Sequence, residues 1–144
     1  MQKPDVSTFE IAEAVAAALN GMELPLVADA RAQVEAAPDY DLPELAKMKI
    51  PVVPSSLELG ARDRVNMENT VKIDIGIFKR IKSEDEIREL VKLEEQIAGA
   101  FYRRRLAEIP AAMCIGAAVD PLYDSDLLRE RRQFTGVIRL EFEL

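Results

Sequence analysis

Apolar and polar residues alternate with two different periods along the chain. From residue 7 to residue 20, apolar side chains recur every three or four positions, the spacing of an amphipathic helix. Ser7 followed by Glu10 is a capping-box sequence at its start, and Asn20-Gly21 supplies a residue for a left-handed stop at its end. A second such box, Ser83 to Glu86, begins a longer helix that Pro110 prevents from continuing.

The rest of the apolar pattern has a period of two, which is typical of half-buried strands. It predicts strands at residues 22–34, 48–52, 70–80, 111–118 and 134–144. Prolines 51 and 54 place the second of these at a sheet edge or at strand ends. Residues 28–37 are rich in alanine and fit a helix as well as a strand. Residues 42–45 indicate a loop or a single turn.

Two helices that interrupt runs of strands predict an α+β fold in one domain, residues 1–144. We expect a mostly antiparallel sheet of four to five strands, with both amphipathic helices packed on one face. Residues 55–68 show no sustained period and are predicted to be a long exposed loop. Charged residues on the alternate positions of the strands would then meet water or another subunit: Lys72, Asp74, Arg139 and Glu141.

The composition excludes several types of catalytic and metal-binding site. The 144 residues include no His and one Cys, which excludes His-dependent catalysis, His-rich metal sites and an internal disulfide. The formal net charge is -7. Residues 1–70 carry twelve acidic and six basic side chains, whereas residues 71–144 are nearly balanced. We expect a soluble intracellular protein, because the sequence shows neither a signal-peptide pattern nor a long apolar run.

No other motif indicates a catalytic or binding site. The glycines form no phosphate-binding loop. Close acidic pairs, such as Asp124 with Asp126 and Glu94 with Glu95, are expected by chance in an acidic chain. Cys114 lies in an apolar run and reads as a buried, inert thiol. We therefore expect no cofactor, no metal and no enzymatic activity.

Basic and aromatic residues also have ordinary explanations. The basic run 103–105 is placed by the pattern at a helix C-terminus, where cations are favourable, and no aromatic residues suited to base stacking interleave with it. A second basic cluster lies at residues 129–132. Tyr123 and Phe134 are predicted to serve in packing.

The chain resembles the small tail terminator, or tail completion, proteins of long-tailed bacteriophages. The resemblance rests on layout and loose motifs over most of the chain, with residues 28–58 matching only as strands and loop. These motifs are Leu19-Asn20-Gly21, Arg62-Asp63-Arg64, the strand from Val71 to Ile77, Lys79-Arg80, the helix from Ser83 to Leu106, Pro121-Leu122-Tyr123-Asp124, Leu127-Leu128 and the strand from Phe134 to Leu144.

The resemblance implies a structural virion protein of the tail and neck that is made in the host cytoplasm. Six copies would form a ring that caps the major tail tube protein and docks onto the head connector or head-closure protein. Genomic DNA would pass through the lumen without specific recognition, and no membrane would be involved. Candidate residues for the assembly interface are Arg62, Asp63, Arg64, Val65, Lys72, Asp74, Tyr123, Arg139 and Glu141.

Three alternatives remain open from the sequence. The chain could be another phage neck protein, such as a head-closure protein, or a tube-like subunit. It could be an enzyme that uses Asp and Glu, alone or with a metal. It could also be a nucleic-acid binder, which would need salt-sensitive retention on heparin.

Overall fold

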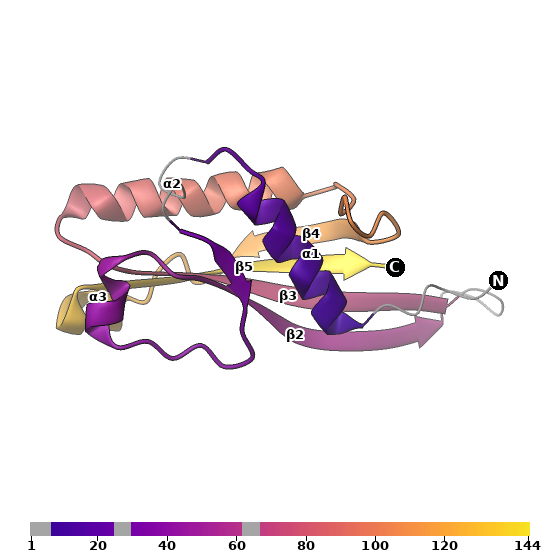
Figure 1. Ribbon diagram of the computed structural model, residues 1–144, viewed down its shortest axis with the longest axis horizontal. Helices are drawn as coiled ribbons and strands as arrows, with labels where there is room; N and C mark the ends of the chain where they lie inside the picture. Colours follow the sequence, from indigo (N-terminus) through magenta and orange to yellow (C-terminus); the bar gives the residue numbers. More distant parts are fainter. Residues whose placement is uncertain (1–6, 25–29, 62–66) are drawn as a thin grey trace.

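A computed structural model of the chain describes residues 7–24, 30–61 and 67–144, and its centre is a five-stranded sheet (Figure 1). The strand order is β1-β2-β3-β5-β4. The strands are β1 (Ala32–Val34), β2 (Ile50–Ala61), β3 (Met67–Arg80), β4 (Met113–Val119) and β5 (Gln133–Glu143). All neighbours are antiparallel except β1 and β2, which are parallel. The predicted α+β fold with a mostly antiparallel sheet is confirmed.

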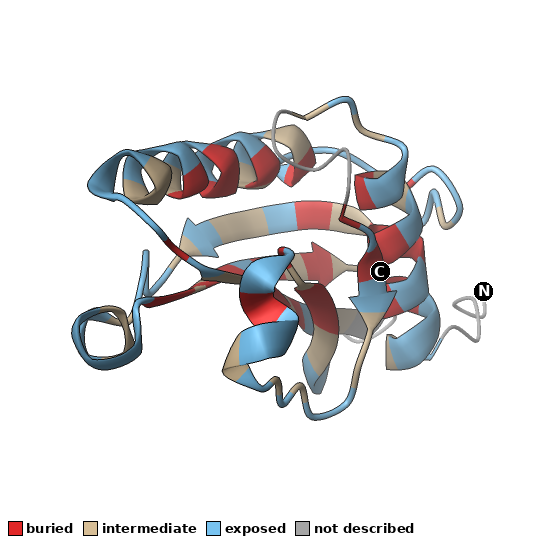
Figure 2. Ribbon diagram, turned by 60° about the vertical axis from the view of Figure 1, so that its left-hand side comes forward, coloured by how far each residue is buried: buried red, intermediate tan, exposed pale blue. Residues whose placement is uncertain are grey.

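Two helices cover one face of this sheet, as predicted. Helix α1 (Thr8–Asn20) packs on β1 and β2, and α2 (Glu84–Phe101) packs on β4 and β5. Their apolar stripes and the apolar positions of the strands form one buried cluster. Figure 2 shows this arrangement, with the buried residues on the sides of the helices that face the strands.

The helix caps differ in part from the sequence prediction. The Glu10 amide donates to the Ser7 hydroxyl at 3.2 Å, as predicted. Gly21 has φ -88°, so the predicted left-handed stop is wrong. At α2, the Glu86 carboxylate accepts from the backbone N–H of Lys82 rather than Ser83, and it also pairs with Lys79 at 2.7 Å. Glu86 thus stands at the third helical position, as a capping box requires, but its carboxylate binds the N–H of the residue before the N-cap.

The predicted long loop at residues 55–68 is wrong. Residues 50–61 and 67–80 are the two arms of a long hairpin, β2 and β3, and only residues 62–66 between them lie outside the described residues. The period was hidden because the register shifts between Pro54 and Ser56. The alternation in Ser56-Leu57-Glu58-Leu59 starts again only after this irregularity.

Two smaller differences and one agreement complete the comparison. Within the described residues of the strand predicted at 22–34, only Ala32–Val34 form a strand, β1; residues 25–29 lie outside the described part. Residues 42–46 form a short 3-10 helix, η1 (Leu42–Ala46), which agrees with the predicted turn. A third helix, α3 (Ser125–Arg131), was not predicted. It begins at Asp124, whose carboxylate accepts from the amides of Asp126 and Leu127, each at 3.0 Å.

No helix in the described ranges is long and apolar enough to span a membrane.

Candidate assembly surface

The face of the sheet opposite α1 and α2 has two different halves. Near η1, it is covered by aromatic packing: the rings of Tyr40 and Phe78 meet edge to face with centroids 5.4 Å apart. A Cβ on Gly76 would lie 2.6 Å from the Phe78 ring and 3.1 Å from Pro51, so glycine is needed beneath this cluster. Tyr40 also donates to the Glu35 carboxylate, and its pKa is raised by burial and by this hydrogen bond.

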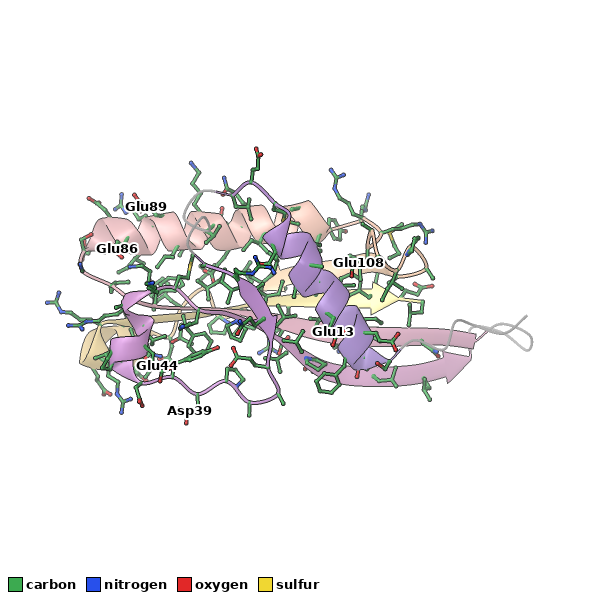
Figure 3. All side chains as sticks on the ribbon, in the orientation of Figure 1. Glu13, Asp39, Glu44, Glu86, Glu89 and Glu108 are labelled. Atoms are coloured by element: carbon green, nitrogen blue, oxygen red, sulfur yellow. The ribbon has the colours of Figure 1, made fainter. Side chains whose placement is uncertain are left out.

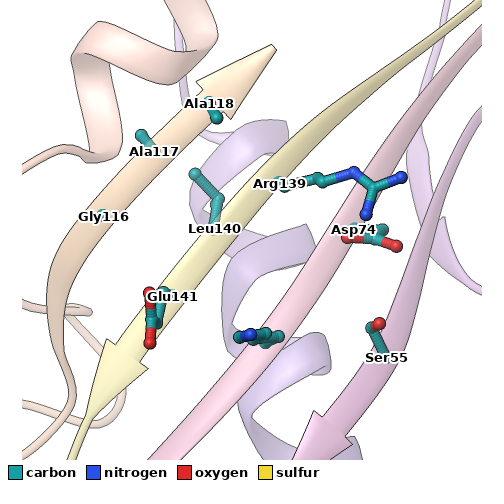
Figure 4. Close-up of a pocket in the computed structure, with 9 residues that line it drawn as sticks. Ser55, Asp74, Gly116, Ala117, Ala118, Arg139, Leu140 and Glu141 are labelled. Atoms are coloured by element: carbon teal, nitrogen blue, oxygen red, sulfur yellow. The ribbon is translucent and has the colours of Figure 1, made fainter. Parts of the chain in front are cut away.

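The other half of this face is open and charged. Four charged side chains stand on β3 and β5 in two cross-strand pairs, Lys72 opposite Glu141 and Asp74 opposite Arg139. In Figure 4, the Arg139 guanidinium lies beside the Asp74 carboxylate. The four predicted interface residues on the two strands are thus brought together, as the alternation of side chains along a strand requires.

Small residues on the neighbouring strands turn this half into a shallow hollow of about 380 Å³. Gly116 and Ala118 line it from β4, and Ser55 lines it from β2 (Figure 4). A Cβ on Gly116 would come within 3.4 Å of Glu141 Oε2. The charged side chains therefore form the floor of the hollow and are not covered by larger neighbours.

The electrostatics of the hollow are balanced within each pair. Burial raises the pKa of Asp74, and the positive charge of Arg139 opposes that rise. Arg139 also donates through Nε to the carbonyl oxygen of Asp120 at 3.0 Å, which holds its side chain over β5. The surface presents two cations and two carboxylates side by side, so it can bind a partner with the complementary pattern.

Of the remaining predicted interface residues, only Tyr123 is described, and it lies away from the hollow. Tyr123 lies next to the buried Phe134, with ring centroids 6.0 Å apart. With Leu122 it borders a second cavity of about 420 Å³ beside α2, away from the charged hollow. Arg62, Asp63, Arg64 and Val65 lie outside the described residues.

The acidic pairs considered in the sequence do not form a common site. Asp124 caps α3, while Asp126 is exposed and lies 3.6 Å from Arg129. Glu94 is fully buried on α2, whereas Glu95 is exposed. Across the described ranges, no three His, Cys, Asp or Glu side chains are grouped closely enough to hold a metal ion. Figure 3 labels acids from several parts of the chain: Glu13 on α1, Glu44 on η1, and Glu86 and Glu89 together on α2.

Cys114 and the basic run at residues 103–105 are linked by hydrogen bonds at the edge of the sheet. Cys114 is buried, and burial raises the pKa of its thiol. Helix α2 ends before the basic run, and Arg103 has φ 61°. Its N–H donates to the Cys114 carbonyl at 2.9 Å, and Arg105 donates to the Pro110 carbonyl at 3.0 Å. The arginines therefore follow the C-cap Tyr102 directly, as predicted for a helix end, but they lie outside its last turn and border β4.

The sequence prediction missed exposed apolar side chains on the hairpin and on β4. Leu57 and Leu59 are 52% and 65% exposed, and Ile115 is 42% exposed. The alternation in Ser56-Leu57-Glu58-Leu59 was the available signal, although it does not reveal that these leucines are uncovered.

Comparison with known proteins adds no family to this description. No model of a known protein family matches the chain, and no curated protein matches it.

Proposed function

We propose that this chain is the subunit of a homo-oligomeric ring that caps the tail tube of a long-tailed bacteriophage and joins it to the head connector. The observation that carries the proposal is the open, charged half of the sheet. One face of the sheet is buried under two helices, whereas this half displays charges of both signs around a shallow hollow.

A surface of this kind suits contact between protein subunits. Cross-strand pairs of opposite charge stabilise an isolated chain by only about 0.2–1 kcal/mol each. When a partner excludes water, the same charges fix its orientation and select against wrong partners. The hollow is shallow and lined by small residues, so a side chain from a neighbouring protein can reach the charges.

The resemblance to tail terminators supplies the identity of the partners. The ring, six-membered in that family, would contact the major tail tube protein on one side and the head connector or head-closure protein on the other. Genomic DNA would pass through the lumen, and the net charge of -7 disfavours non-specific binding to it. The working location would be the neck of the virion, after assembly in the host cytoplasm.

Tail tubes provide the direct test. The purified chain is mixed with isolated tubes of the phage that encodes it, and the mixture is imaged by negative-stain electron microscopy. We expect a ring at one end of each tube. Binding along the whole tube, or no binding, would contradict the proposal.

Two charge-reversal variants test whether tube capping depends on the charged hollow. Lys72→Glu with Arg139→Glu reverses both cations of the hollow and should abolish either ring formation or tube capping. Arg88→Glu with Lys92→Glu makes the same change in net charge on exposed positions of α2. This control should cap tubes as the wild type does.

A further inference from the structure

The two edges of the sheet are closed over part of their length by local hydrogen bonds. On β1, the Asn20 side chain accepts from the Ala32 N–H at 2.8 Å and donates to its carbonyl at 3.1 Å. On β4, Cys114 exchanges hydrogen bonds with the backbone of Arg103 and Arg104, both at 2.9 Å. Such covering prevents an edge strand from pairing with another chain.

Two stretches of edge are left open. β1 pairs with β2 only as far as Val52, and from Leu57 to Gly60 the backbone of β2 pairs, within the described residues, with β3 alone. On the opposite edge, residues 115–119 of β4 lie beyond the contact with Arg103 and Arg104, and their described partner is β5. Each open stretch is an available template for a further strand.

The hydrogen-bond phase on β2 shows which groups point outward. Lys49 and Phe78 exchange two backbone hydrogen bonds, at 2.8 and 3.0 Å. Because such pairs alternate along an antiparallel ladder, the even-numbered residues of β3 bond to β2 and the odd-numbered ones to β5. Leu57 and Leu59 lie opposite Val71 and Asn69, both odd-numbered. Their own N–H and C=O groups therefore point away from the sheet.

The same reasoning applies to β4. The Asp120 N–H donates to the Val137 carbonyl at 2.9 Å, so by alternation Gly116 and Ala118 bond to β5. Ala117 and Val119 then point their backbone groups outward. The backbone groups of Cys114 also point outward, although Gly116, two residues later, bonds to β5. The register shift between Cys114 and Gly116 inserts one extra residue and so accounts for this change of direction.

Side chains at the two open edges match as well. Leu57 pairs with buried Val71, and Ala117 pairs with buried Leu140, so both stand on the face that α1 and α2 cover. The exposed apolar residues Leu57, Leu59 and Ile115 all belong to these edges. Pairing one edge with the other would bring apolar side chains together on the helix face and leave the charged face continuous.

Strand direction is compatible with this pairing. β2, β3, β5 and β4 alternate strictly in direction. If a second copy lies beside the first in the same orientation, its β2 therefore runs antiparallel to β4 of the first copy. The alternation of strand direction then continues from one copy to the next.

We propose that β2 of one copy, through residues 57–60, pairs antiparallel with residues 115–119 of β4 in the next copy, so that one sheet continues from subunit to subunit. This inference rests on the proposed function and specifies its subunit contact. Because the two edges differ, the contact is head-to-tail, and repeating it closes a ring if the rotation allows.

Proline variants test the backbone pairing. Leu59→Pro and Ala117→Pro each remove an outward N–H and leave the internal ladder intact. Each should raise the concentration needed for half-assembly, measured by light scattering, by about tenfold or more. Leu59→Val and Ala117→Ser keep the N–H and should assemble within about threefold of the wild type. Circular dichroism and thermal melting check that the variants are folded.

Cysteine cross-linking tests the same contact without proline. One chain carries Ala117→Cys, and the other carries either Leu57→Cys or Leu59→Cys, which covers the two registers that keep the outward groups opposite each other. Directly paired strand positions are close enough for a disulfide. We expect a cross-linked dimer only when the two chains are mixed, since the native Cys114 is buried.

The outcomes separate the two proposals. Rings whose assembly is insensitive to both prolines and that give no mixed cross-link overturn the edge pairing and leave the ring. A dimer from Ala117→Cys alone would show β4 paired with β4 and also overturn the inference. A wild-type chain that stays monomeric overturns the proposed function, and absence of the mixed cross-link between its cysteine variants overturns the edge pairing too.

Discussion

The two faces of the sheet are made from alternate residues of the same strands, yet they have opposite characters. On β5, Ile138 and Leu140 are buried under the helices, while Arg139 and Glu141, which alternate with them, stand on the open face. The covered face holds the fold together by removing apolar surface from water. The open face contributes little to the stability of the fold and is available for contact with partners.

A buried carboxyl group interrupts the apolar packing of the covered face. Glu94 on α2 has no exposed surface, and neither carboxylate oxygen has a hydrogen-bond partner in the described part of the chain. A Cβ on Gly136 would overlap this carboxyl group and the Leu122 carbonyl oxygen, so glycine in β5 makes room for it. Burial, with a smaller effect from Glu95, raises the pKa of Glu94 to about 8.

The largest effect on stability is expected from truncating a buried side chain on the covered face. Ile138→Ala should lower the free energy of unfolding by about 2–5 kcal/mol, because it leaves a cavity under α2. Val137→Ala, next to it on the open face, should cost less than about 1 kcal/mol. Urea unfolding of both variants at low protein concentration measures the difference. Equal effects would mean that the two faces are assigned wrongly.

The second prediction concerns Glu94 and pH. The folded state holds a proton on this group up to about pH 8, whereas the unfolded chain loses it near its ordinary pKa of 4.5. The contribution of Glu94 to the free energy of unfolding of the wild type should therefore fall as the pH rises from about 5 to 8. Above pH 8 it should level off. Glu94→Gln should remove this fall and stabilise the chain at pH 8 by on the order of 3 kcal/mol.

Glu95→Gln is the matched control, because its side chain is exposed on the same helix. It should leave the pH profile of thermal melting nearly unchanged. If Glu94→Gln melts as the wild type does at both pH 5 and pH 8, the carboxyl group is not buried as described.

The smallest effect is expected on the open face. A double-mutant cycle with Lys72→Ala and Glu141→Ala should give a coupling of about 0.2–1 kcal/mol in the dissociated chain. The same cycle measured on assembly should give a larger coupling if the pair becomes desolvated. Equal couplings in both states would place this pair outside any interface.

Periodicity alone predicted much of the fold, and the failures have physical reasons. β3 and β5 alternate strongly because one side of each faces the helices, so their residues and faces were predicted correctly. The hairpin arm at residues 55–61 was missed because the register shift after Pro54 interrupts the alternation, and only Leu57 and Leu59 continue it beyond that point. Helix α3 was missed because it is short and contains no buried residue.

The candidate surface was predicted only in part for similar reasons. Period two places Lys72, Asp74, Arg139 and Glu141 on one face, but their pairing depends on the β3–β5 register, which comes from tertiary structure. The buried state of Glu94 could not be read from its position, because a single polar residue in an apolar stripe can also lie at the stripe's border.

The mass of the wild-type protein in solution tests the central claim most directly. Sedimentation equilibrium over a wide range of concentrations should show one closed species of several copies, six if the resemblance to tail terminators holds, and no larger polymers. A chain that remains monomeric at every concentration would contradict the account, since the open face and open edges would then have no subunit to bind.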